Sequence, residues 1–188
     1  MPEQVSRIRA LGKVSGKDHA GRSACIVGGG EAGSIGAHDY VIRMLGHGNE
    51  YADYIVAPSH RYSHYRLQKE RPDCPIWVYG LRPDGSRCDA WRISPWPNAV
   101  FVDHLIEPYL YDGACPLRGC MAGILAMLLL DIDRLYFYGC DMLMRGELVN
   151  ERATLMTIAH EKGIMLVDCS SIGGCNYEGD LCRQNYEP

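Results

Sequence analysis

The chain has 188 residues, of which 47% are hydrophobic and 22% are charged, and its formal net charge at pH 7 is -4. These values suit one globular domain with a buried core and exclude a disordered or fibrous chain. The negative charge also argues against a surface built to bind nucleic-acid backbone, because such surfaces carry many lysines and arginines. We expect residues 1–188 to form a single domain, with a polar N-terminal arm at 1–22 and a C-terminal tail or flap at 170–188.

The first half of the chain predicts five short strands. Each is an apolar run of strand length that ends near a glycine, a proline or polar residues. The runs cover residues 24–29, 39–45, 52–59, 75–81 and 98–105. A polar segment at 60–72 predicts a surface helix that ends at Pro72. Residues 82–98 are rich in turn formers and predict a loop or hairpin.

The second half alternates helices with strands. Residues 117–132 are apolar on nearly all sides, as a helix packed between other elements is, and residues 133–142 predict a strand. Residues 150–163 predict a helix that ends in a glycine, and a strand follows at 164–170. Strands that alternate with helices pair in parallel through right-handed crossovers. The sequence therefore predicts an α/β fold, a Rossmann-like three-layer sandwich with a mostly parallel sheet.

No segment is typical of export or of membrane insertion. The N-terminal residues contain no apolar stretch of signal-peptide length. The longest apolar run, residues 120–132, is too short for a membrane span and contains Asp131. We therefore expect a cytoplasmic protein whose nine cysteines are mostly reduced and fill the core. The cysteine spacing is wider than in zinc-binding CxxC pairs, so we predict no metal site.

A glycine cluster, Gly28 to Gly30, follows the first predicted strand and is followed by Glu31. Ligands of such sheets bind beyond the carboxyl ends of the strands, and glycine lets the backbone approach a phosphate closely. The cluster lacks the Gly-Lys-Ser/Thr of a Walker loop, and too few residues follow it for the crossover helix of a dinucleotide fold. Its pattern fits either a nucleotide-binding loop or a tight turn without a ligand.

The helix predicted from residue 117 offers a second candidate site. The first amides of a helix are unpaired and lie at its positive end, so a phosphate could bind at Met121, Ala122 and Gly123. Alternatively, Gly123 only permits close packing of this helix on the sheet. The sequence leaves both interpretations open.

Two segments of the chain resemble the sialyltransferases. Residues 24–45 resemble the large nucleotide-binding motif of that family, most specifically at 37–44, which read AHDYVIRM. Residues 118–168 contain an apolar helix and a strand ending in Tyr-Gly, and they are similar to the small motif. The resemblance implies transfer of a sialic acid from a cytidine monophosphate (CMP) donor to a hydroxyl of a glycan or other acceptor. It also implies inversion at the sugar, with no obligatory metal and no cofactor besides the donor itself.

The resemblance and the strand ends together define a predicted donor site. The glycine cluster would line the ribose and phosphate, and the helix start would hold the phosphate. Glu31 and Ser59 lie in loops at the same predicted edge. The predicted donor-binding residues are Gly28, Gly29, Gly30, Glu31, Ser59, Met121, Ala122, Gly123 and Asp141.

Several positions depart from the family pattern. Gly29 and Leu45 stand where the family carries asparagines, and Ala122 stands where it carries serine or threonine. Each change removes a side-chain hydrogen bond to the donor, with a net contribution of about 0.5–1.5 kcal/mol. The catalytic histidine of the family would align near residues 145–147, which contain no histidine.

Other histidines could take the acceptor proton. His104, beside Asp103, lies at the end of the strand predicted at 98–105, and His60 and His64 follow the strand predicted at 52–59. An imidazole titrates near neutral pH, so any of the three could serve. We therefore predict His104 and His60 as candidate catalytic bases, with Glu147 as a weaker one. Two hypotheses follow: a metal-independent glycosyltransferase, or a catalytically inactive nucleotide-binding or interaction protein of the same fold. A nucleotide-dependent phosphotransferase is a third reading, and the sequence is compatible with an oligomer.

Overall fold

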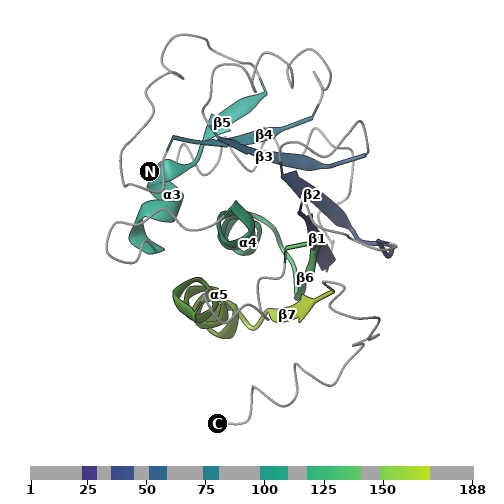
Figure 1. Cartoon of the computed structure of the whole chain (residues 1–188), viewed down its shortest axis with the longest axis vertical. Coiled ribbons are helices and arrows are strands. Elements are labelled where there is room, and N and C mark those ends of the chain that lie inside the picture. Colours follow the sequence, from purple (N-terminus) through teal and green to yellow (C-terminus); the bar gives the residue numbers. More distant parts are fainter. Residues whose placement is uncertain are drawn as a thin grey trace.

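The computed structural model describes residues 23–28, 35–44, 51–58, 74–80, 98–109, 118–140 and 149–169. Within these residues seven strands form one parallel sheet (Figure 1). The strands are β1 Ser23–Val27, β2 Tyr40–Met44, β3 Tyr54–Pro58, β4 Ile76–Tyr79, β5 Ala99–Phe101, β6 Arg134–Tyr138 and β7 Met165–Asp168. The helices are α3 Asp103–Ile106, the 3-10 turn η3 Glu107–Tyr109, α4 Arg118–Leu129 and α5 Val149–Lys162. The chain therefore has the α/β, Rossmann-like fold that the sequence predicts.

The sheet order is β5-β4-β3-β2-β1-β6-β7, which places β1 in the interior. The first five strands follow one another from β1 outward to one edge. The chain then returns, and β6 pairs with the other side of β1. The strand order thus reverses between β1 and β6. Ligands of open α/β sheets bind at this kind of reversal, beyond the carboxyl ends of the strands.

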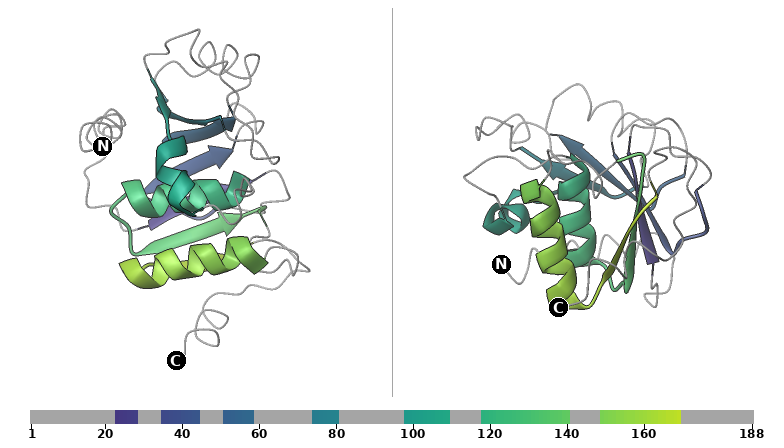
Figure 2. Two further views of the ribbon diagram at one scale, coloured as in Figure 1. Left: turned by 90° about the vertical axis from the view of Figure 1, so that its left-hand side faces the viewer. Right: turned by 60° about the horizontal axis from the view of Figure 1, so that its bottom comes forward.

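Helices α4 and α5 pack side by side on one face of the sheet (Figure 2). Residues 119–127 of α4 are all buried, as expected for a helix that contacts β1, β2, β6 and α5. On α5 the predicted apolar face is confirmed, because Leu155, Ile158 and Ala159 are buried while His160 is exposed. A three-layer sandwich also needs a layer on the opposite face of the sheet. The connections between the first five strands would form that layer, and most of their residues lie outside the described residues.

The two faces of the sheet carry separate hydrophobic clusters, because successive side chains of a strand point to opposite sides. On β1, Ile26 packs into the large core beneath α4 and α5. Cys25 and Val27 pack on the other face, where Tyr138 and the segment that begins at Ile35 join them. Burial on both faces explains why these strands read as continuous apolar runs.

The predicted elements are confirmed wherever the structure describes them, with one correction. The strands and α4 are shorter than predicted, and α5 is shifted by one residue. The strand predicted at 98–105 ends at Phe101, and Asp103–Ile106 form the short helix α3 instead. The Asp103 carboxylate accepts the amide of Gly80 at 2.9 and 3.0 Å, which binds the start of this helix to the end of β4. The predicted helix at 60–72, the arm at 1–22 and the tail at 170–188 lie outside the described residues. Among the helices described, none is long and apolar enough to cross a membrane.

Candidate functional site

The carboxyl ends of β1 and β6 meet at Gly28 and Gly139. The Gly28 amide donates to the carbonyl of Tyr138 at 2.7 Å. A Cβ atom on Gly28 would lie 2.5 Å from the Gly139 carbonyl oxygen and 2.7 Å from Cys140 Sγ. Real Cβ atoms do not approach other atoms so closely, so a glycine is required here for two backbones to come together.

The structure brings together residues 24–45 and residues 118–168, the two segments on which the predicted donor site rests. The first supplies β1 and β2, and the second supplies α4, β6, α5 and β7 (Figure 1). Strand β1 pairs with both β2 and β6, and α4 contacts all three strands. Segments far apart in the sequence thus form one continuous centre of the fold around the strand reversal.

Met121, Ala122 and Gly123 lie inside α4 rather than at its first residues. The helix begins at Arg118, which puts the unpaired amides of the first turn at or before Met121. A Cβ on Gly123 would lie 2.8 Å from Leu155 Cδ2 and 3.1 Å from Phe137 Cζ. The structure therefore accounts for Gly123 by close packing of α4 against α5 and β6. An anion at this helix would use the amides of the preceding turn.

His104 lies on α3, which follows β5. Strand β5 is four positions from β1 in the sheet, or ~19 Å at the usual spacing between strands. The side chain is half-buried, and its Nε2 is buried with no hydrogen-bond partner among the described residues. Burial lowers the pKa of His104 below its ordinary value, and the charge of Asp103 opposes this shift. The imidazole is thus neutral at pH 7, the form in which it can accept a proton.

Seven of the other candidate site residues lie outside the described residues. They are Gly29, Gly30, Glu31, Ser59, His60, Asp141 and the weaker candidate base Glu147.

The sequence assigned no role to His38, which packs on the face of the sheet opposite α4. Its ring centroid lies 4.6 Å from that of Tyr136 and 5.6 Å from that of Tyr138. Its Nε2 is 3.0 Å from the hydroxyl of Tyr138. Nδ1 is buried and has no hydrogen-bond partner in the described part of the chain. Burial lowers the pKa of His38, and the neighbouring Asp39 opposes the shift.

The hydroxyl of Tyr138 lies where the segment before β2 reaches β6. Its hydrogen-bond partner is Nε2 of His38, a Cβ placed on Gly36 would lie 3.6 Å from it, and Cys169 packs against the same cluster. Burial is the main cause that raises the pKa of Tyr138 to about 12, so the phenol stays protonated at neutral pH. In the sequence, His38 stands out within residues 37–44, and Tyr138 stands out because it precedes Gly139. Neither position indicates that the two side chains are in contact.

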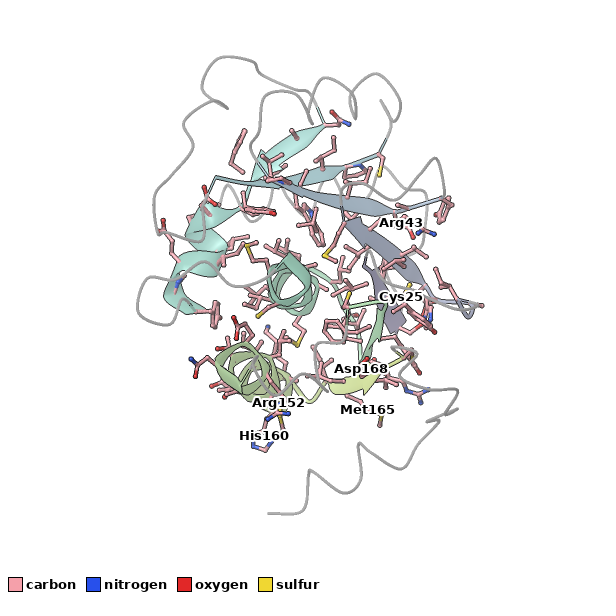
Figure 3. All side chains as sticks on the ribbon, in the orientation of Figure 1. Cys25, Arg43, Arg152, His160, Met165 and Asp168 are labelled. Carbon is pink, nitrogen blue, oxygen red and sulfur yellow. The ribbon has the colours of Figure 1, made fainter. Side chains whose placement is uncertain are left out.

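Cys25 lies in β1 on the same face as this cluster. It is fully buried, as the sequence predicts. Burial raises its pKa to about 12, and the nearby Arg43 opposes the shift (Figure 3). A thiol with this pKa is neutral at pH 7 and does not serve as a nucleophile. The five cysteines that the structure describes are thiols rather than disulfides, and no metal-binding group occurs among the described residues.

Comparison of the chain with family models, with curated proteins and with solved structures found no match. The geometry and the sequence motifs are therefore the grounds on which a function is proposed.

Proposed function

We propose that the chain binds a nucleotide-sugar donor, a CMP sugar, where β1 and β6 meet, and transfers its sugar to an acceptor hydroxyl. The observation that carries this proposal is the placement of the two motif-like segments. They form four adjacent strands, β2, β1, β6 and β7, and the helices α4 and α5 packed on one face, around the one reversal of strand order in the described sheet. A donor bound at this reversal would contact both segments at once.

The close approach of Gly28 to Gly139 marks the edge of the sheet at which the donor would bind. The Gly139 carbonyl and Cys140 Sγ fill the space beside Gly28, and the Gly28 amide already donates to Tyr138. A phosphate would therefore be held by main-chain amides that follow Gly28, which the sequence predicts at Gly29 and Gly30. In the transfer the bond between the sugar and the phosphate breaks, the acceptor oxygen bonds to the sugar carbon, and the nucleotide leaves.

The acceptor hydroxyl loses a proton in this reaction, so a base is required. His104 is neutral at pH 7 because burial lowers its pKa, which is the state a base needs. Its place beyond β5 would put the acceptor on that side of the sheet edge. His60, which follows β3 in the sequence, is the other candidate.

A second function is favoured by the position of His104. The distance between β5 and β1 separates this histidine from a group held at Gly28, and residues 145–147 contain no histidine. A chain that keeps the donor site but has no base within reach would bind nucleotides, or a protein partner, without turnover. This is the catalytically inactive alternative.

Calorimetry and a turnover assay distinguish the two functions. We expect CMP and CMP-sialic acid to bind more tightly than uridine or guanosine sugar nucleotides, and CMP-sialic acid to be consumed in the presence of EDTA. His104→Ala should lower turnover by about 10²–10⁴-fold without changing donor affinity, the range for loss of a general base. His160→Ala, on the exposed side of α5, is the matched control and should act as the wild type (Figure 3).

Other results of these two assays would support a different function. Binding without consumption of the donor identifies the inactive alternative. Consumption that needs magnesium and a nucleoside triphosphate identifies a phosphotransferase. Absence of binding to CMP and to every sugar nucleotide overturns the proposal.

A further inference from the structure

We propose that protonation of His38 in mild acid releases residues 35–39 from the face of the sheet and exposes the thiol of Cys25. We call residues 35–39 the crossing segment. The inference concerns a conformational equilibrium of the protein alone, so it does not depend on the proposed nucleotide site. The residues on which it rests all lie in the described part of the chain.

The crossing segment lies on the face of the sheet opposite α4, over the side chains of β1. At its start, Ile35 packs against the cluster that contains Cys25 and Val27. At its end, the Asp39 carboxylate accepts the amide and the hydroxyl of Ser23 at 2.9 and 3.0 Å. Because Ser23 begins β1 and Val27 ends it, the segment runs the length of this strand. Cys25 beneath it is fully buried.

His38 joins the crossing segment to β6. Its Nε2 lies 3.0 Å from the hydroxyl of Tyr138. Its ring centroid lies 4.6 Å from that of Tyr136 and 5.6 Å from that of Tyr138. Nδ1 is also buried, but it has no hydrogen-bond partner within the residues that the structure describes. This contact therefore satisfies only one of the two ring nitrogens.

Protonation changes what the His38 site must provide. A neutral imidazole has one N–H group, and its Nε2 can either accept from a phenol or donate to it. The imidazolium has two N–H groups, and the one at Nδ1 would be buried and charged without an acceptor. This holds for either tautomer of the neutral ring. The closed arrangement therefore disfavours the charged form, which water can solvate once the segment opens.

The charged groups near His38 do not remove this effect. Arg43 lies on the same face of β2, where its Nε donates to the carbonyl of Tyr51 at 2.8 Å, and its positive charge opposes protonation. The Asp39 charge favours protonation, but burial outweighs it and lowers the pKa of His38. The other titratable side chains are phenols and thiols, which are uncharged in mild acid. They are Tyr136 and Tyr138 of β6, Cys169 beside β7 and Cys25 of β1.

A lowered pKa in the closed state fixes the direction of the pH dependence. Below pH 6.5 the open segment binds a proton at His38 that the closed segment resists, so opening becomes more favourable as the pH falls. Well above pH 6.5 the ring is neutral in both states, and the equilibrium no longer depends on its titration.

Labelling of Cys25 measures the opening. Dithiodipyridine reacts with accessible thiols in mild acid, and peptide mass spectrometry identifies which cysteine is labelled. The full chain is labelled briefly at pH 7.5, 6.5 and 5.5, and each rate is divided by the rate for the urea-unfolded chain at the same pH. We expect this ratio for Cys25 to rise by up to about tenfold from pH 7.5 to 5.5, the limit for an open-state pKa of 6.5.

Cys120 provides a control within the same chain. It is fully buried as well, but it lies on α4 in the core on the other side of the sheet (Figure 1). Opening of the crossing segment leaves it covered, so it should be labelled more slowly than Cys25 at each pH. Equal ratios for Cys25 and Cys120 overturn the inference, because unfolding of the whole domain would then expose both thiols.

Variants test whether His38 is the responsible group. His38→Gln is uncharged at every pH and keeps an amide that can reach the phenol, so the rise for Cys25 should disappear. His160→Gln, which replaces the exposed histidine of α5, should keep the wild-type rise. A rise that persists in His38→Gln overturns the inference, since another group would then cause the opening.

The hydrogen bond to Tyr138 allows a second test, which does not need the His38 variant to fold. Tyr138→Phe removes the partner of Nε2, so Cys25 should be labelled faster already at pH 7.5. Tyr136→Phe leaves that bond in place and should be labelled as the wild type. If Tyr138→Phe and the wild type are labelled at the same rate at pH 7.5, His38 does not hold the segment and the inference is overturned.

Discussion

At Gly28 the identity of one residue decides how closely two strands approach. The carbonyl of Gly139 and the sulfur of Cys140 occupy the space that a side chain would need. Gly36 lies at the other end of the same connection, and the nearest atom to a Cβ there is the Tyr138 hydroxyl at 3.6 Å, an ordinary contact. Gly28 and Gly36 therefore flank the same connection, but a side chain would clash with neighbouring atoms only at Gly28.

Alanine at these two positions should therefore have unequal effects. We expect Gly28→Ala to lower the free energy of unfolding by about 1–3 kcal/mol, because the backbones of β1 and β6 must separate. Gly36→Ala should change it by less than about 0.5 kcal/mol. Urea denaturation of both variants measures the difference. Equal effects would contradict the close backbone contact between Gly28 and Gly139.

The sequence identified the strand end at Gly28 but not its partner. A glycine cluster after an apolar run indicates a site where backbone approaches something, whether a ligand or another strand. That β6 fills this position depends on pairing between residues more than a hundred positions apart, which no local pattern encodes. The contact of His38 with Tyr138 was missed for the same reason.

Among the helices, α5 ends in an arrangement that glycine stabilises. Gly163 has a positive φ of 66°, its amide donates to His160 at 3.2 Å, and the Ile164 amide donates to Ala159 at 2.8 Å. These two bonds form a Schellman motif, which satisfies carbonyls that the helix leaves unpaired. No atom lies within 4 Å of a Cβ placed on Gly163, so a substitution there affects only the backbone conformation.

We expect Gly163→Ala to lower the free energy of unfolding by about 1–2 kcal/mol, the strain of a left-handed conformation for a residue with a Cβ. Gly163→Asn should be less destabilising, because asparagine adopts this conformation more readily. Thermal unfolding of the two variants gives the comparison. If asparagine destabilised the protein as much as alanine, backbone conformation would not be the cause.

The elements were predictable where apolar runs had the length and breakers of one type of structure. The run at 98–105 was the exception, because its apolar pattern fits a strand and also a helix start. The structure resolves this ambiguity by tertiary contacts: Val102 donates to the carbonyl of Val78, and Asp103 accepts from Gly80. Both partners belong to the preceding strand and its end, and local sequence does not reveal them.

At the scale of the whole molecule, the parallel sheet was predictable and the order of its strands was not. Alternation of strands and helices implies parallel pairing, but the place where the chain reverses direction across the sheet is a property of packing. That order puts His104 far from Gly28. The sequence predicted His104 and the glycine cluster as parts of one site. In the structure three strands, β2, β3 and β4, lie between β1 and β5.

Stability of the whole molecule should fall in mild acid. Burial lowers the pKa of both His38 and His104 below the ordinary value of 6.5. Below pH 6.5 the unfolded chain takes up protons at these histidines that the folded chain resists, so the free energy of unfolding decreases as the pH falls. Well above pH 6.5 both histidines are neutral in the folded and the unfolded state, and their contribution is constant.

Urea denaturation at pH 7.5, 6.5 and 5.5 measures this dependence. We expect the double variant His38→Gln with His104→Gln to show a flatter pH profile than the wild type. The control His160→Gln replaces an exposed histidine and should keep the wild-type profile. A double variant with an unchanged profile would show that other groups cause the loss of stability in acid.

The interior position of β1 has a consequence for how the protein is made. Strand β1 is among the first parts of the fold to leave the ribosome, and its neighbour β2 follows soon after, but its other neighbour β6 begins only at Arg134. Until translation reaches that point, an apolar strand has one edge without a hydrogen-bonding partner, which favours association with other chains. Pairing across so long a stretch of chain also slows folding. Strand β1, at the proposed donor site, therefore gains its second neighbour only after strands β2 to β5 and helix α4 have been synthesised.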